Sequence, residues 1–388
     1  MATKRLCPGL HRPRSQVISV NRGKLKKVAA TLPEKVRKLT DYELFELGKN
    51  AQYTVKSMLQ TVFDAAMNFT SIEVVAGLKK DSPSADTIRG HLDWKVSLDG
   101  VENMMKTDVK RLATSVMRKF NRAIFDIAVD WTSEMYYGRK GNSSVNGTKP
   151  QAGSCYAYEF FTVSIVTEGF RFLLFAYPLY GRENLLYYVN RAKIFLHKLG
   201  IRIHNLYLDR GFRSVDNIAF LQDEKIRFIM PAPHDCKFER LVEPEQKLPA
   251  VFWGWQMQNA AKETVQVNLV VTAEFVEGDG GRLVRRLCGF FTNIPADEWR
   301  DKPEKIAEWY GMRWGIETAH RCEDEFRIKS TSVSGIVRYL YFVIGMLVYD
   351  LWVYLNLLFC EDIDGFKITV KKDFIRLLCS MQFARFLI

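Results

Sequence analysis

The chain has 388 residues, of which 47% are hydrophobic and 26% are charged. This composition is typical of a folded globular protein and excludes disordered, fibrous and collagen-like chains. Lys and Arg number 56 against 44 Asp and Glu, so the formal net charge is +12. A chain this basic usually binds a polyanion, with nucleic acid as the first expectation and an anionic membrane surface as the second.

The cysteines indicate a reducing compartment. All seven are scattered singly and form no CxxC pair, so we expect free thiols and a cytoplasmic protein. The first residues lack the apolar stretch of a secretory signal, although their basic, acid-free composition also fits an organelle transit peptide. The six histidines show no spacing typical of metal ligands.

An apolar run at 339–359 raises the question of a membrane span. Its only strongly polar members are Asp350 and Asn356. The length would permit a span, but a charged Asp near the centre is costly in lipid, and no second apolar segment of similar length follows. We predict a buried helix of a soluble core and no membrane partner, with a membrane-associated protein as the alternative.

The N-terminal third is predicted to be helical behind a basic arm. Residues 1–33 hold eight Lys or Arg and no acid, and form either a solvated flexible tail or an arm that binds phosphates. Residues 34–118 are predicted to form a helical DNA-binding domain, starting at a capping box of Thr40 and Glu43. Two short helices around a polar turn, the second capped by Ser84, form a possible helix-turn-helix or a plain scaffold.

From Ala123 onward the pattern changes to apolar, β-rich runs. The predicted strands lie at 124–130, 157–167, 171–180, 203–209 and 227–231, and the predicted helices at 183–199 and 214–225. The order β-β-β-α-β-α-β predicts an α/β sheet with parallel strands after the crossover helix. Residues 236–299 are predicted to be a small antiparallel insertion, and one long helix is predicted from Pro303 through Phe326.

Three acidic residues lie where carboxylates often serve chemistry. Asp130 and Asp209 each end an apolar strand, and Glu317 lies inside the long helix. Carboxylates at strand ends face the crevice in which open α/β sheets bind ligands. Three of them would hold Mg²⁺, with Mn²⁺ as an alternative, and two such ions could clamp an in-line phosphoryl displacement.

Each of these carboxylates also has a purely structural interpretation. Asp130 could initiate a turn, and Asp126, four residues earlier on the same face of the strand, competes for its role. We prefer Asp130 because the end of its strand should match the end of the strand that carries Asp209. Asp209 could belong to a simple turn, and Glu317 could pair with an Arg along its helix.

Two motifs resemble a known family. LYLDRGF, which contains Asp209, and YGMRWGIET, which contains Glu317, resemble the signature regions of insertion-sequence transposases of the DDE type, specifically the "insertion sequence four" group. That family pattern is Tyr, two residues, Arg, three residues, Glu, six residues, Lys. Tyr310, Arg313 and Glu317 match it in register, and Asp324 stands where the family has Lys.

The resemblance implies an RNase H-like catalytic domain. It assigns residues 119–235 and 300–359 to this mixed sheet with flanking helices, 236–299 to a β-strand insertion, and 360–388 to a C-terminal tail. It implies a DNA transposase with Asp130, Asp209 and Glu317 as catalytic and metal-binding residues. Such an enzyme would cut at the terminal inverted repeats of its own element and join the freed 3′-hydroxyl ends to target DNA.

The implied partners are DNA and a second copy of the chain on paired ends, with the protein associated with the nucleoid when bound. In this family the Tyr and Arg of the signature contact DNA. The candidate DNA contacts are Tyr310, Arg313, Arg321, Arg210, Trp253, Trp255 and Arg89. The alternatives are a transposase-derived DNA-binding protein without catalytic activity and a simple nuclease that shares the fold.

Geometry expected from the spacing supports these contacts. In one continuous helix, offsets of 3, 4 and 7 would place Tyr310, Arg313 and Glu317 on one face. Trp253 and Trp255 are expected on one face of a strand, either as core residues or as a platform for stacked bases.

Asp324 leaves open which residue supplies the cation of the family pattern. Arg321, Arg327 and Lys329 are nearby, and Arg321 is favoured because it lies one turn beyond Glu317. Asp324→Lys is therefore expected to be tolerated or activating.

Two further expectations concern the surroundings of this site. His320, three residues beyond Glu317, is expected to be a partly exposed helix residue. Residues 1–118 are expected to be removable without unfolding the catalytic core.

Overall fold

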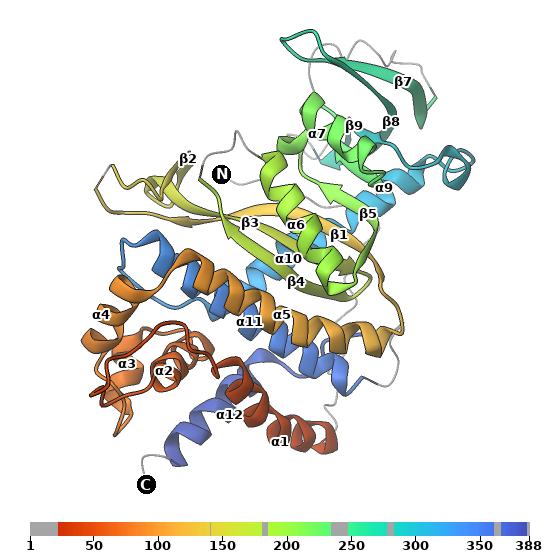
Figure 1. The fold of residues 1–388 in the computed structure, drawn as a ribbon. Coiled ribbons are helices and arrows are strands. Elements are labelled where there is room, and N and C mark those ends of the chain that lie inside the picture. The colour runs from red at the N-terminus through yellow and green to blue at the C-terminus, as the bar shows by residue number, and fades with distance from the viewer. Residues whose placement is uncertain are drawn as a thin grey trace. The chain divides into compact units, whose positions relative to one another are not determined.

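The computed structural model describes residues 22–139, 141–180, 185–233, 247–277, 283–360 and 366–385. The chain, whose elements are labelled in Figure 1, divides into two compact units, and strand β1 (Ile124–Met135) contributes to both. Apart from residues near the start of the chain, the first unit contains Phe125–Val129 and Ile203–Trp314. The second contains Ser19–Ile124, Asp130–Arg202 and Gly315–Ile388. Residues 1–21 of the expected basic arm lie outside the described residues.

The first unit is built on a mixed sheet with the strand order β1-β5-β6-β9-β8-β7. These strands are β5 (Arg202–Leu208), β6 (Phe228–Pro231), β7 (Ala250–Gln258), β8 (Thr264–Glu277) and β9 (Leu283–Thr292). β5 and β6 run parallel with α7 (Val215–Asp223) between them in sequence, and β9 pairs antiparallel with both β6 and β8. The other elements are η1 (Arg210–Phe212), η3 (Ala296–Glu298) and α9 (Glu304–Gly311).

The strands β7, β8 and β9 confirm the predicted antiparallel insertion. Because β9 also pairs with β6, the insertion extends the sheet of the first unit and is not a separate layer. A bulge interrupts β7 between Phe252 and Trp255, where Gly254 has a φ of +61° that favours glycine. The regular alternation expected to place Trp253 and Trp255 on one face is interrupted at this point.

The second unit carries the remaining strands. They are β2 (Asn146–Gln151), β3 (Ser154–Thr167) and β4 (Phe170–Pro178), in the order β2-β3-β1, with β4 also pairing with β3. The predicted hairpin between β3 and β4 is confirmed, and Gly169 in its turn has a φ of +72°. β2 was not predicted, because its sequence NGTKPQ is polar and lacks apolar alternation.

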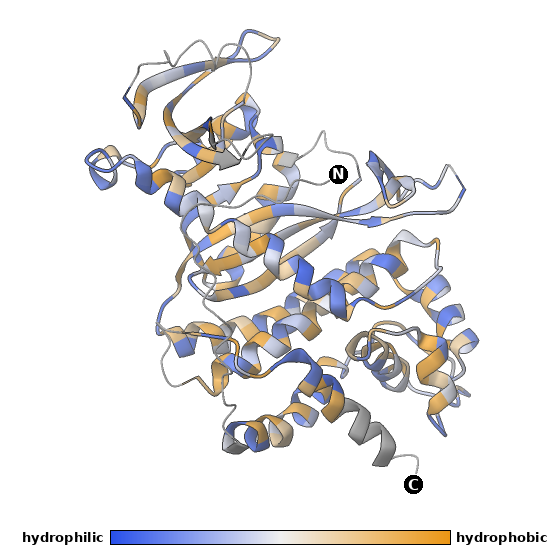
Figure 2. Ribbon diagram, turned by 180° about the vertical axis from the view of Figure 1, so that it is seen from behind, coloured by the Kyte–Doolittle hydropathy of each residue, from blue (hydrophilic) through white to orange (hydrophobic). Residues whose placement is uncertain are grey.

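Helices make up most of the second unit, and apart from the apolar α11 they carry both hydrophobic and hydrophilic residues (Figure 2). They are α1 (Arg22–Leu39), α2 (Val55–Met67), α3 (Ile72–Leu78), α4 (Ala85–Lys95), α5 (Leu98–Phe120), α6 (Leu185–Leu199), α10 (Trp314–Glu323), η4 (Asp324–Phe326), α11 (Gly335–Leu358) and α12 (Lys372–Arg385). The predicted cap on α4 is confirmed, since Ser84 Oγ accepts the N–H of Thr87. With its mixed sheet and flanking helices, the chain has the predicted α/β fold class.

The start of the helical region differs from the prediction. α1 begins at Arg22, inside the segment expected to be a flexible arm. Thr40 does not begin a helix but follows the end of α1, where its hydroxyl donates to the carbonyl of Arg37. The next helix, α2, is capped by Thr54. The capping-box interpretation was therefore wrong, because a Thr can bond backward to the preceding turn as readily as forward to the next.

The apolar segment that raised the membrane question is α11. By length and composition α11 could cross a membrane, but nine-tenths of its most apolar stretch is buried inside the protein. It packs against α5, α2, α1 and β4, and in Figure 1 α5 and α11 lie side by side. Its polar residues Asp350 and Asn356 are fully buried and hydrogen-bonded to other segments. The predicted buried core helix is confirmed.

The packing around α11 divides the chain differently from the predicted domains. The segment 34–118 does not form a unit of its own, since α2 and α5 lie in the same unit as β3, β4 and α11. The N-terminal helices therefore cover the core helix directly.

This arrangement reverses the expectation for a truncated chain. Deleting residues 1–118 removes α1, α2 and α5 and exposes their side of α11 to water, and each large apolar residue so exposed costs about 1.5 to 3 kcal/mol. We expect the truncated protein to be insoluble or to lack a cooperative thermal transition by circular dichroism. A soluble truncated protein that melts cooperatively like the full chain would contradict this role of the helices.

The buried carboxyl of Asp350 makes stability depend on pH. Its Oδ1 accepts the N–H of Leu173 at 2.9 Å, and burial raises its pKa well above the ordinary value. The unfolded chain releases this proton near pH 4 while the folded chain keeps it, so stability falls as the pH rises above about 4, by at most about 1.4 kcal/mol per pH unit. Asp350→Asn, which cannot ionise, is expected to lose less stability between about pH 4 and pH 8 in urea unfolding.

The matched control is Asp373→Asn, at an exposed position of α12. This variant should retain the wild-type pH dependence. An Asp350→Asn protein with the wild-type slope would show that the carboxyl is ionised in the folded state.

Candidate active site

Two motifs far apart in the sequence meet in the first unit. Asp209 follows β5 directly and precedes η1, as expected for a carboxylate at a strand end. Arg313 lies between α9 and α10, is only 8% exposed, and brings Nη2 to 3.9 Å from Asp209 Oδ1. Its guanidinium carbon lies 5.6 Å from the ring centre of Tyr310, which packs on Phe290 of β9. The structure thus brings together three of the predicted site residues.

The helix that carries the third acid is interrupted. The sequence predicted one helix from Pro303 through Phe326, but α9 ends at Gly311 and α10 begins at Trp314. Tyr310 and Glu317 therefore lie on different helices, and the argument that places both on one continuous face was wrong. Glu317 lies in the first turn of α10.

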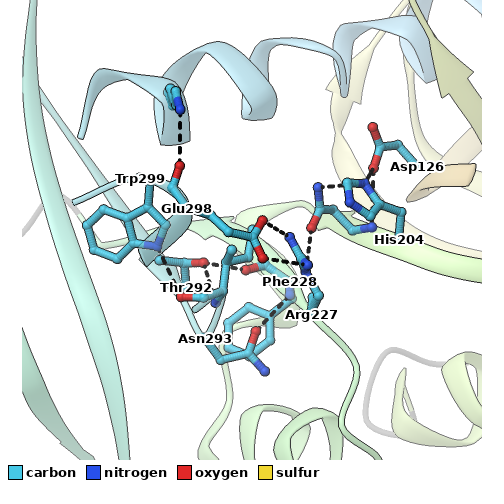
Figure 3. A network of polar contacts seen from close by, with 11 residues as sticks. Asp126, His204, Arg227, Phe228, Thr292, Asn293, Glu298 and Trp299 are labelled. Carbon is cyan, nitrogen blue, oxygen red and sulfur yellow. Dashed lines mark hydrogen bonds and ion pairs between the residues drawn. The ribbon is translucent and has the colours of Figure 1, made fainter. Parts of the chain in front are cut away.

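A polar network assigns a structural role to Asp126 (Figure 3). Asp126 Oδ1 accepts the backbone N–H of Asn205 in β5 at 3.2 Å and lies 2.9 Å from Nδ1 of His204. The side chain of Asn205 accepts from Arg227, which also donates to both carboxylate oxygens of Glu298 at 2.8 and 2.6 Å. Asp126 is thus engaged in joining β1 to β5, which leaves Asp130 as the candidate in this strand.

The same network continues along the sheet in Figure 3. The side chain of Asn293 accepts the N–H of Phe228, the hydroxyl of Thr292 donates to the Phe228 carbonyl, and the Trp299 indole donates to the Ile294 carbonyl. The first two bonds fix β6 to the end of β9, and the third spans η3.

Asp130 belongs to the second unit and is half-buried. Its Oδ1 accepts the N–H of Trp131, and its carbonyl accepts the hydroxyl of Thr162 in β3 at 3.2 Å. Thr162 Oγ1 lies 2.9 Å from Nε2 of His320. Because the hydroxyl proton of Thr162 goes to Asp130, the imidazole Nε2–H is the donor to Thr162.

His320 was expected to be partly exposed and is instead buried. Burial, together with the charge of Arg327, lowers its pKa to about 3, so the ring stays neutral. It connects α10, one turn beyond Glu317, to the strand that carries Asp130. Its spacing from Glu317 was the available sequence signal, whereas nothing in the sequence indicated Thr162.

The three cations considered in place of the family Lys have different surroundings. Arg327 is mostly buried, and its Nη2 lies 2.6 Å from Asp324 Oδ1. The ammonium of Lys329 lies 4.8 Å from the ring centre of Phe69. Arg321 is exposed on α10.

The remaining DNA-contact candidates are partly or largely exposed. Arg210 is exposed in η1, directly after Asp209. Trp253 is half exposed, stacks on Trp299 at 5.1 Å and lies beneath Arg300. Trp255 packs edge-on against Phe252. Arg89 on α4 forms ion pairs with Glu73 and Asp86.

The acids are the oxygen ligands that Mg²⁺ prefers. Asp209 belongs to the first unit, and Asp130 and Glu317 to the second. Among the described residues, no three His, Cys, Asp or Glu side chains are gathered as a metal-binding group. Cys155 and Cys322 are free thiols.

One of the comparisons with known proteins identifies the family. Over 94% of this chain and 80% of the other, the fold resembles a piggyBac transposase synaptic complex with hairpin DNA, at 12% identity and a TM-score of 0.49. Over 51% and 43% of the two chains it resembles the Drosophila P element transposase strand transfer complex, at 15% identity and a TM-score of 0.24. No curated protein matches the sequence. Residues 126–349, more than half of the chain, match the family described as "Transposase DDE domain", and the protein therefore belongs to this family.

Proposed function

We propose that the protein cuts DNA at the terminal inverted repeats of its own element and joins the freed 3′-hydroxyl ends to target DNA. The observation that carries this proposal is the approach of Arg313 to Asp209 in the first unit. It brings the strand-end acid and the Tyr-Arg signature to one place, and both lie within the residues that match the transposase family. A single motif match would not require this contact.

The residues that we propose to hold the divalent metal are Asp130, Asp209 and Glu317. Members of the family generally use divalent metal ions, and a set of three carboxylates fits Mg²⁺ or Mn²⁺. The bound metal would supply charge neutralisation at the phosphate under attack and activation of the attacking oxygen. In β1, Asp130 lies four residues beyond Asp126. Asp209 lies four residues beyond Asn205, whose backbone N–H donates to Asp126.

The chain's own cations and polar groups would position the DNA. Arg313 presents a planar guanidinium that can grip a phosphate through two hydrogen bonds, and Tyr310 holds this group from one side. Arg210 and Arg321 are exposed and available to neighbouring phosphates. His320 is neutral, so we assign it the positioning of Asp130 through Thr162 and no transfer of a proton.

The proposal extends to the wider DNA contacts and to assembly. Arg89 on α4, exposed Trp253 and the neighbouring Trp255 are proposed contacts along the bound DNA. Paired ends require two active sites, so we propose a homodimer on DNA. The alternative, a transposase-derived DNA-binding protein without catalysis, differs in one property, which is metal-dependent cleavage.

The first test of the function uses the three acids. Asp130→Ala, Asp209→Ala and Glu317→Ala should each abolish Mg²⁺-dependent nicking of DNA that carries the sequences flanking the gene. Loss of a metal ligand removes several orders of magnitude in rate, because the metal stabilises charge that develops only in the transition state. DNA binding in gel shifts should persist in all three variants.

The matched control is Asp126→Asn. It keeps the oxygen that accepts from Asn205 and should cleave like the wild type. Nicking at the wild-type rate by a folded Asp209→Ala protein would overturn the metal assignment. Absence of nicking in the wild type under both Mg²⁺ and Mn²⁺ would favour the binding protein.

A second test concerns the neutral His320. Its pKa of about 3 in the folded chain lies below the ordinary value near 6.5, so the unfolded chain binds a proton that the folded chain does not. Stability is therefore complete above about pH 6.5 and decreases as the pH falls toward about 3. His320→Gln should reduce this acid-side slope in urea unfolding, and the pH profile of cleavage from about pH 6 to 9 should keep its shape.

The comparison variant for this test is Thr162→Val, which removes the hydrogen bond but keeps the imidazole. It should retain the acid-side slope. A changed cleavage profile in His320→Gln, with loss of an ionisation near pH 6, would show that His320 exchanges protons during the reaction.

A further inference from the structure

A cluster of charged side chains lies inside the second unit, away from the proposed metal ligands. It consists of Glu134 in β1, Glu323 at the end of α10, Asp324 in η4, Arg327 directly after η4, and Arg338 in α11. Glu323 is completely buried, and the side chain of Glu134 is 13% exposed. No step of the proposed reaction uses these residues.

Arg327 occupies the centre of this cluster. Its Nη2 lies 2.6 Å from Asp324, and its Nε lies 3.4 Å from Glu323 and 3.8 Å from Glu134. Nη2 also lies 3.5 Å from the hydroxyl of Thr132. The guanidinium carbon lies 5.9 Å from the ring centre of Phe342 in α11. The group is therefore contacted by acids and a hydroxyl at its edges and by an aromatic ring on one face. A side chain with so many contacts has one fixed position.

The electrostatics of the cluster require this cation. Burial raises the pKa of Glu134 and raises that of Glu323 to about 8, while Arg327 acts in the opposite direction on both. The neighbouring carboxylates keep Arg327 itself charged. A neutral side chain at 327 would remove the group that opposes this rise in both pKa values and would leave Asp324 without its ion-pair partner in Arg327.

The elements that Arg327 joins are those that carry two of the proposed metal ligands. Thr132 and Glu134 follow Asp130 at steps of two residues, so all three lie on one face of β1. Glu323 lies in α10, six residues beyond Glu317. A second link, from His320 through Thr162 to the Asp130 carbonyl, joins the same strand and helix. Neither link uses the carboxylates of Asp130 or Glu317.

We propose that Arg327 is a positioning residue that fixes the strand carrying Asp130 against the helix carrying Glu317, and that Asp324 orients Arg327 for this role. The inference rests on the proposed function, because this role of the cluster requires that Asp130 and Glu317 are metal ligands. Mg²⁺ and Mn²⁺ tolerate only small errors in ligand geometry, so the separation of strand and helix controls the affinity for metal.

The same contacts change the expectation for position 324. The sequence alone favoured Asp324→Lys as tolerated or activating. In the structure, Lys at 324 would remove the carboxylate that lies 2.6 Å from Arg327 and add a like charge three residues before it. Asp324→Lys should therefore weaken the site.

The experiment measures Mn²⁺ binding by the full-length protein, from the loss of the free Mn²⁺ signal in electron paramagnetic resonance. Arg327→Lys should raise the midpoint of the Mn²⁺ titration about 10-fold, as changes behind metal ligands commonly do. Asp324→Lys should also raise it, and Asp324→Asn should raise it less, because the amide oxygen still accepts from Arg327. Asp324 is half exposed, so these variants should fold even if Arg327→Lys does not.

The matched control is Asp373→Asn, which removes the acid of an Asp-Arg pair with the same three-residue spacing in α12. It should bind Mn²⁺ like the wild type. Thermal melting without metal separates the two roles, since a purely structural cluster would lower the melting temperature and leave the Mn²⁺ midpoint unchanged. That result, or an Asp324→Lys protein that binds Mn²⁺ as tightly as the wild type, would overturn the inference.

The Asp130→Ala and Glu317→Ala proteins distinguish failure of the inference from failure of the proposed function. If both retain the wild-type Mn²⁺ binding, the proposed metal site itself is wrong. If both lose it while the variants at 324 and 327 match the wild type, the metal site stands and only the positioning role is refuted.

Discussion

The burial of α11 is the constraint on which the second unit depends. A helix of this length that is apolar on all sides must be covered on all sides, since each exposed large side chain would cost about 1.5 to 3 kcal/mol. The N-terminal helices cover part of it and β4 covers another part. Asn356 extends this role to the C-terminal segment, because its side chain accepts the N–H groups of Thr369 and Val370. Segments from both ends of the chain are thereby fixed around one helix.

This apolar core also determines which partners a polar or charged side chain beside it needs. Phe342 of α11 forms the surface on which the Arg327 guanidinium lies, and Arg338 of the same helix approaches Glu134. A cation placed against an apolar helix loses water, so it needs carboxylates at its edges. His320 is treated differently, because its neutral ring needs only the hydroxyl of Thr162. The charged Arg327 and the neutral His320 therefore both hold β1 against α10.

The sequence predicted those features that depend on local pattern. Apolar runs located β1, β3, β4 and β5, and the position of Asp209 after its strand followed from the same pattern. The three-residue spacing predicted that Tyr310 and Arg313 share a face, and their side chains lie close together. The pattern missed β2, which is polar, and the interruption between α9 and α10, because a short turn preserves apolar periodicity. Thr162 and Glu134 were missed because their roles arise from neighbours distant in sequence.

Asp324 shows how a departure from a family pattern can follow from the backbone. In an unbroken helix, a residue seven positions after Glu317 lies two turns further along the same face. Here α10 ends at Glu323, and the chain continues through the short turn η4 into an extended Arg327. Position 324 is the first residue of η4, where the helical turn tightens before the chain becomes extended. A carboxylate at this point instead meets Arg327, which the end of the helix has turned back toward β1.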